Sequence, residues 1–256
     1  MHLSDSQIEE YDRSGYLLFP GLLDQEEAQL LKVTASVLCA RPGPEIVREK
    51  ESNGIRLAYG GHEVCEPYKR LSTLPRLLNP VRQLLREDAY IHQSRLNPKE
   101  GFSGGAWNWH QDFGTWHRED GMPEPHCVMT AIFLDDSTAV NGPLLVLPGS
   151  QHHGIVNTVT REDATGYTVS DFANRNGIVP LMGPAGTVAF IHCNLVHGSS
   201  NNVSPWPRSI MYFNYNAVSN APTGGNGRAW YHNNQDHTPL ELGDDDGLYA
   251  LTRAAE

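Results

Sequence analysis

Residues 126–150, HCVMTAIFLDDSTAVNGPLLVLPGS, contain the clearest indication of the fold class. They hold two apolar, strand-like runs, and the segments Asn141-Gly142-Pro143 and Pro148-Gly149-Ser150 punctuate them with turn residues. Similar runs recur as AYIHQSRL (89–96), GTVAFIH (186–192) and RSIMYFNYNAV (208–218). Short strands separated by turns are typical of antiparallel barrels and sandwiches. The sequence therefore predicts a β-barrel or double-sheet roll from about residue 89 onward.

Helical signals concentrate before that point. Ser4 with Gln7 forms a capping box for a helix to residue 14, and DQEEAQLLKVTASVLC (24–39) reads as an amphipathic helix. A helix over 75–87 is expected in two pieces because Pro80 interrupts it. GYLLFPGLL (15–23) predicts a short strand. We expect one domain over 1–256, with a helical layer at about 1–88, a β core at about 89–220 and a C-terminal loop segment at 221–256.

Composition excludes several classes of partner. The net charge of −11 and the lack of a basic run argue against nucleic acid and anionic membranes. No signal peptide or apolar stretch of about 18 residues is present, which argues against export or a membrane span. The four cysteines contain no C-x-x-C pair and are expected as buried thiols. We expect a cytoplasmic monomer or homodimer acting on a small molecule, with a long loop, or lid, at 154–180.

A candidate metal site lies in WNWHQDFGTWHREDG (107–121). His110 and Asp112 are one residue apart, so on a strand they would share one face. A third ligand is available from GTVAFIHCNLVHG (186–198), as His192 or, after the strand and beside Gly198, as His197. Two histidines and one carboxylate that leave open positions on an ion form the facial triad of non-haem Fe(II) oxygenases. His117, Glu119 and Asp120 are expected in a solvated loop.

Arg208 follows His197 by eleven residues and opens the last predicted strand. From there a guanidinium can reach into the barrel and bind a carboxylate through two parallel hydrogen bonds. On the strand at 89–96 and beyond, Gln93, Arg95 and Asn97 alternate on one face, and the pattern leaves open which face points inward. Arg228, in the C-terminal loop, is a candidate for a substrate carboxylate.

The H-x-D…H…R pattern, with NGPLLVLPGSQHHG, HGSSNNVSPWPR and GYLLFPGLL, resembles the phytanoyl-CoA dioxygenase superfamily from about residue 4 to 240. WNWHQDFGTWHREDGMP is most similar to ectoine hydroxylases and hydroxylases of free amino acids, although Gln111 and Gly114 depart from the usual ectoine pattern. The resemblance implies a mainly β fold with flanking helices around a double-stranded β-helix (jelly roll, cupin-like). It also implies Fe(II), with 2-oxoglutarate and O2 as cosubstrates.

The resemblance further implies roles for individual residues. It gives His110, Asp112 and His197 to iron, Arg208 with Asn97 and Ser199 to 2-oxoglutarate, and Gln93 and Trp116 to substrate. The expected activity is hydroxylation of an unactivated C–H bond in a small zwitterionic substrate, such as a free aliphatic or cyclic amino acid or an ectoine-like compound.

Three other functions are compatible with parts of the pattern. A tailoring oxygenase for a larger natural product, by hydroxylation, desaturation or cyclisation, would use the same triad. A non-catalytic jelly-roll binding protein would need neither Asp112 nor Arg208. A zinc hydrolase is disfavoured because H-E-x-x-H is absent.

Overall fold

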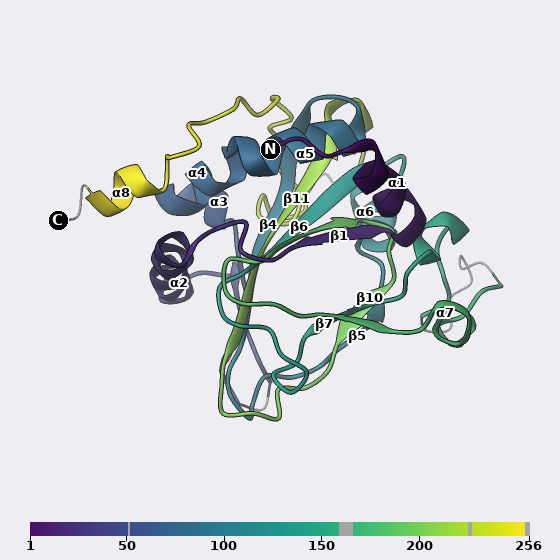
Figure 1. Ribbon diagram of the computed structural model, residues 1–256, viewed down its shortest axis with the longest axis horizontal. Helices are drawn as coiled ribbons and strands as arrows, with labels where there is room; N and C mark the ends of the chain where they lie inside the picture. Colours follow the sequence, from purple (N-terminus) through teal and green to yellow (C-terminus); the bar gives the residue numbers. More distant parts are fainter. Residues whose placement is uncertain (51, 159–165, 225–226, 254–256) are drawn as a thin grey trace.

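Two antiparallel sheets form the centre of the molecule (Figure 1). The computed structural model describes residues 1–50, 52–158, 166–224 and 227–253. The larger sheet has the order β1-β9-β6-β11-β4-β3-β2, with bounds β1 Tyr16–Phe19, β9 Val188–His192, β6 Cys127–Phe133, β11 Arg208–Ala217, β4 Ala89–Lys99, β3 Ile55–Tyr59 and β2 Ile46–Arg48. The smaller sheet has the order β5-β10-β7-β8, with bounds β5 Trp107–His110, β10 His197–Ser199, β7 Leu144–Val146 and β8 Val179–Leu181.

These sheets confirm the predicted jelly roll with flanking helices. Each of the five strand-like runs in the predicted β core contains a strand: β4, β6, β7, β9 and β11. The two inner faces enclose a small apolar core, which includes Met129, Phe133, Val146 and Ile210. Strands β2 and β3 were not predicted, and they extend the larger sheet from within the expected helical layer.

Helices cover the outer face of the larger sheet (Figure 1). They are α1 Asp5–Ser14, α2 Gln25–Cys39, α3 Gly61–Val64, α4 Glu66–Thr73 and α5 Pro75–Leu85, with α6 Asp112–Asp120, α7 Val169–Asn176 and α8 Tyr249–Arg253 elsewhere, and two short 3-10 turns at Ser150–His153 and Val218–Asn220. The predicted capping box of Ser4 and Gln7 is present at α1, and Asp24 caps α2. The main apolar core lies between this layer and the sheet, and contains Leu31, Leu71, Leu78 and Phe213. None of the helices in the described ranges is long and apolar enough to cross a membrane.

Two local predictions were wrong. The helix at Pro75–Leu85 is continuous through Pro80, because burial of Leu77, Leu78, Val81 and Leu85 in the core outweighs the hydrogen bond that proline removes. The second half of the predicted 154–180 loop contains α7 and β8. The helix α7 begins at a capping box between Thr168 and Asp171, a signal that the sequence displays. Residues 159–165, in the middle of the predicted lid, lie outside the described residues.

Candidate metal centre and its cavity

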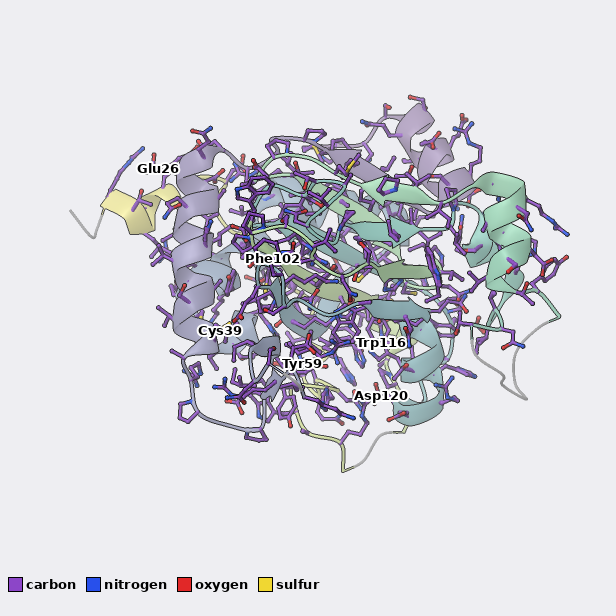
Figure 2. All side chains as sticks on the ribbon, turned by 90° about the horizontal axis from the view of Figure 1, so that it is seen from below. Glu26, Cys39, Tyr59, Phe102, Trp116 and Asp120 are labelled. Carbon is purple, nitrogen blue, oxygen red and sulfur yellow. The ribbon has the colours of Figure 1, made fainter. Side chains whose placement is uncertain are left out.

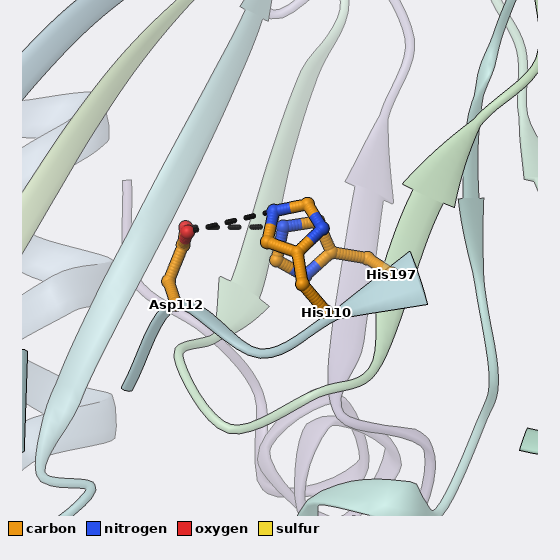
Figure 3. A group of neighbouring side chains, drawn as sticks. All are labelled: His110, Asp112 and His197. Atoms are coloured by element: carbon orange, nitrogen blue, oxygen red, sulfur yellow. Dashed lines mark ion pairs between the residues drawn. The ribbon is translucent and has the colours of Figure 1, made fainter. Parts of the chain in front are cut away.

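His110, Asp112 and His197 converge at one end of the smaller sheet (Figure 3). Strand β5 ends at His110 and pairs with β10, so that His110 lies directly opposite His197. The chain then turns through Gln111, and Asp112 is the first residue of α6. The spacing predicted that His110 and Asp112 share one face of a strand. This prediction was wrong, because β5 ends at His110 and Asp112 belongs to α6. They meet because the strand gives way to a helix between them.

Gln111 fixes this turn. Its side chain is buried, and its amide donates to the backbone oxygens of Gly154 and Asn194, while its carbonyl accepts from Val156 N at 2.7 Å. The strands β5 and β10 also approach each other closely at Gly198. An added Cβ at this position would lie 3.0 Å from the backbone oxygen of Trp107. Both features hold β5 and β10 together at the point where the two histidines face each other.

Both histidine rings present the same nitrogen to the candidate centre. His110 Nδ1 lies 2.7 Å from the backbone oxygen of Asn108, and His197 Nδ1 lies 2.9 Å from that of Leu195. Each Nδ1 is therefore the protonated nitrogen, which leaves the Nε2 lone pair free for a metal. The two Nε2 atoms lie 3.7 and 3.8 Å from the Asp112 carboxylate, and the candidate ligand atoms all fall within 4.8 Å of one another.

Charge and burial prepare these ligands for a cation. Burial alone would raise the pKa of Asp112, but Arg95 and the two histidines lower it to about 2, so the carboxylate is ionised. Burial lowers the pKa of His197 to about 4, helped by the nearby His110, so this imidazole is neutral at pH 7. A carboxylate and neutral imidazoles are the forms in which these side chains bind metals. The donor set fits Fe(II).

The triad opens into a cavity of about 230 Å³. Gln93, Arg95 and Asn97 line it, which settles the inward face of β4. Its walls include four Tyr and Trp side chains, and Figure 2 shows two of them, Tyr59 and Trp116, with Asp120 on the same helix as Trp116. Further lining residues are Leu57, Trp107, Thr115, Leu144, Gly198, Ser199, Tyr212, Arg228 and His232. The structure thus brings Gln93, Asn97, Trp116, Ser199 and Arg228 to the same cavity as the triad.

Arg208 lies behind the wall of this cavity. It is fully buried at the start of β11, and its Nη1 donates to Asn97 Oδ1 at 3.1 Å. Its Nε and Nη2 donate to the backbone oxygen of Gly142 at 2.9 and 2.6 Å. A guanidinium has five N–H donors, so one on Nη1 and one on Nη2 remain for an anion. Ser199 Oγ is buried in the cavity wall without a hydrogen-bond partner among the described residues, which fits a carboxylate acceptor.

The sequence did not predict that Asp112 forms a buried ion pair with Arg95. Arg95 Nη2 forms an ion pair with the carboxylate, and its Nη1 donates to Gln93 Oε1 at 3.0 Å. The guanidinium also lies 5.3 Å from the centre of the Tyr212 ring. The alternation of Gln93, Arg95 and Asn97 was the available signal, but choosing the inward face required the structure.

The prediction of a solvated charged loop at His117, Glu119 and Asp120 was right only about the exposure of His117 and Glu119. These residues belong to α6, and Asp120 is fully buried. Its carboxylate contacts His92 Nε2 at 3.2 Å and Arg228 Nη1 at 2.6 Å. His92 and Arg228 are 28 and 108 residues away in the sequence, so no local pattern could have shown that this charge is paired.

Comparisons with known proteins agree with this geometry. The chain is 38% identical over 238 residues to an L-proline trans-4-hydroxylase of Streptomyces griseoviridis, with 86% of this chain and 88% of that protein covered. It is equally similar to an ectoine dioxygenase of Bordetella bronchiseptica, also 38% identical over 238 residues, with 85% and 77% covered.

Solved structures give the same result. The fold matches that of EctD from S. alaskensis with 2-oxoglutarate and 5-hydroxyectoine, with a TM-score of 0.87, 37% identity and coverage of 94% of this chain and 88% of that one. The non-haem carbocyclase SnoK, at 21% identity and a TM-score of 0.72, shares the fold. The family model for phytanoyl-CoA dioxygenase matches residues 11–210, most of the chain. The chain therefore belongs to the phytanoyl-CoA dioxygenase (PhyH) family.

Proposed function

We propose that this protein is an Fe(II)- and 2-oxoglutarate-dependent hydroxylase of a small zwitterionic molecule, such as a free cyclic or aliphatic amino acid or an ectoine-like compound. The observation that carries the proposal is the triad itself: two imidazole Nε2 atoms face one ionised carboxylate at the floor of a cavity. The relatives named above as proline and ectoine hydroxylases support the substrate class.

In this proposal each part of the cavity has a task. His110, Asp112 and His197 hold the metal, and Arg208, with Asn97 and Ser199, binds the distal carboxylate of 2-oxoglutarate. Fe(II) and 2-oxoglutarate, when bound with O2, supply the oxidising power that replaces a C–H bond by C–OH. The protein's own contribution is to orient the carbon atom and to exclude water.

The substrate would occupy the part of the cavity lined by Gln93, Trp116 and Arg228. Aromatic walls at Tyr59, Trp107, Trp116 and Tyr212 are apolar and keep the reacting centre dry. The volume of about 230 Å³ is below the roughly 300–1,000 Å³ of pockets for drug-sized ligands. This size favours a small substrate over the larger natural product of a tailoring enzyme.

The proposal also includes a reducing compartment. Cys39, Cys65, Cys127 and Cys193 are all free thiols. Free thiols are typical of the cytoplasm, where disulfides are rare. We therefore keep the cytoplasm as the proposed site of action.

The test is succinate release by the purified protein loaded with Fe(II) and 2-oxoglutarate without oxygen and then exposed to it. L-Proline, L-pipecolate, L-leucine and ectoine are added singly, and each product is examined for a mass increase of one oxygen atom. We expect stimulation by at least one of them, and none in Asp112→Ala, which cannot complete the triad. Metal binding without 2-oxoglutarate-dependent succinate would contradict the proposal.

A further inference from the structure

A buried polar cluster lies beside the candidate metal centre. We call the side chains of His92, Asp120 and Arg228 the Asp120 cluster. Asp120 ends helix α6, eight residues after the triad member Asp112, and has no exposed surface. One carboxylate oxygen accepts from Arg228 Nη1 at 2.6 Å, and the other faces His92 Nε2 at 3.2 Å. Of these three side chains, only that of Arg228 reaches the cavity.

The charges in the Asp120 cluster show which side chain balances the negative charge of Asp120. Burial lowers the pKa of His92, although the contact with Asp120 opposes this shift, so the imidazole is neutral and donates from Nε2. The negative charge of Asp120 is therefore balanced by Arg228. A buried carboxylate is strongly destabilising unless a cation and hydrogen bonds compensate its charge. The buried carboxylate of Asp120 therefore requires the Arg228 guanidinium beside it, and this requirement fixes the position of Arg228.

The backbone around Arg228 is tied to the same two elements. Before it, Gly224 N donates to the backbone oxygen of Asp120 at 2.9 Å. After it, Asn234 N donates to the backbone oxygen of His92 at 3.1 Å, and Gln93 Nε2 donates to that of His232 at 3.0 Å. Arg228 is thus held by its own side chain, and the chain that follows it is tied to β4. A group held in this way loses little conformational entropy when it binds a ligand.

Arg228 also has free hydrogen-bonding capacity, and unlike Arg95, the second guanidinium of the cavity, it forms no ion pair with the triad member Asp112. Arg95 donates to Asp112 and to Gln93. Arg228 uses Nη1 for Asp120, and its Nε lies 3.8 Å from Glu119. Among the described residues, Nη2 of Arg228 has no acceptor. Its side chain is 23% exposed, while Asp120 behind it is sealed from solvent.

We propose that Asp120 and His92 are positioning residues that hold Arg228 as the receptor for the substrate's carboxylate group. This inference rests on the proposed hydroxylase function and deepens it: Arg228, held by Asp120, makes the site prefer a free carboxylate over the corresponding amide. Arg228 is preorganised for this contact, and the side chains that preorganise it, Asp120 and His92, do not line the cavity.

The experiment is calorimetric titration, without oxygen, of the protein loaded with Mn(II) and 2-oxoglutarate. The ligands are three matched pairs: L-proline and L-prolinamide, L-pipecolate and its amide, and L-leucine and L-leucinamide. We expect at least one acid to bind, and its amide to bind at least about tenfold more weakly, the loss that a charge-assisted contact predicts. Arg228→Gln should bring acid and amide to within about twofold, and Arg228→Lys should recover part of the preference.

The positioning role has its own readout. Asp120→Asn keeps the shape of the side chain but removes its charge, so we expect acid binding to weaken while the Kd values for Mn(II) and 2-oxoglutarate stay unchanged. If Asp120→Asn does not fold, Arg228→Gln still decides the role of Arg228, and His92→Gln tests the positioning. Binding of an amide as tightly as its acid, binding of none of the acids, or unchanged binding by Arg228→Gln overturns the inference. Succinate release separately decides the hydroxylase function.

Discussion

The ion pair between Arg95 and Asp112 gives the sharpest test of how the metal site is built. Removal of the charge in Arg95→Met leaves Asp112 buried without its main cation. Asp112 has a pKa lowered from 3.8 to about 2 in spite of its burial. This shift corresponds to about 2–3 kcal/mol of net stabilisation of the ionised form, which is lost as the pH falls from 3.8 towards 2.

The expected loss in the metal-free variant at pH 7 is larger than this net value. Breaking one side of a buried ion pair typically costs about 3–5 kcal/mol, because the remaining charge has no partner. For a chain of this length, the thermal midpoint should fall by about 10 °C. Loss of a group that orients a metal ligand should also weaken metal binding about 10–100-fold.

The free energy of unfolding and the affinity for metal can both be measured on one preparation of Arg95→Met. Urea unfolding of the metal-free protein gives the free energy of unfolding, and Mn(II) titration gives the metal Kd. Arg41→Met is the matched control, since Arg41 is exposed at the surface. We expect the control to change neither quantity. An unfolding free energy within about 0.5 kcal/mol of the parent, the usual range for surface substitutions, together with an unchanged metal Kd, would refute the structural role of this pair.

Two further predictions concern Arg208 and Lys99, two buried cations that face each other across the pairing of β11 with β4. Arg208→Lys keeps the charge but loses the planar fork, so the Kd for 2-oxoglutarate should rise about 10–150-fold with metal affinity unchanged; an unchanged Kd in calorimetry would assign the cosubstrate to another cation. Burial lowers the pKa of Lys99 from 10.5 to about 7, so above pH 7 the unfolded chain binds the extra proton and stability rises with pH. From pH 7 to 8.5 the gain should reach about 2 kcal/mol in urea unfolding, and Lys99→Met should remove it; a variant with the same slope would exclude Lys99 as its source.

The strands of the core could be predicted because their signal is local. The apolar runs that contain β4, β6, β9 and β11 end at turn residues, and burial on the sheet follows directly from that pattern. The short strands β2 and β3 lack such a run, since their residues are mostly half-buried or exposed. β3 becomes a strand because the edge of β4 offers unpaired backbone groups, as the pairing of Ala58 with Leu96 shows, and β2 then pairs with the free edge of β3.

The charged partners of the site could not be predicted for a related physical reason. A carboxylate or guanidinium is stable inside a protein only beside its counterion. The partners of Asp112 and Asp120 lie 17, 28 and 108 residues away along the chain. From sequence alone, Asp120 within HRED is indistinguishable from a solvated acid. The fold, by closing β4 and the C-terminal segment around α6, decides that it is buried.

The triad lies between these two cases. The spacing of His110 and Asp112 predicted their proximity through the alternation of a strand, yet the structure achieves it through the junction of β5 and α6. A continuous strand and a strand-to-helix junction both bring His110 and Asp112 together at this spacing. They differ in what surrounds the Asp112 carboxylate. On a strand Asp112 would depend on its neighbours across the sheet; at the start of α6 it sits where the helix dipole favours a negative charge. Because Asp120 ends the same helix, α6 carries the candidate metal ligand Asp112 at one end and the carboxylate that pairs with Arg228 at the other. The spacing between the candidate metal centre and Arg228 is therefore set by one short helix.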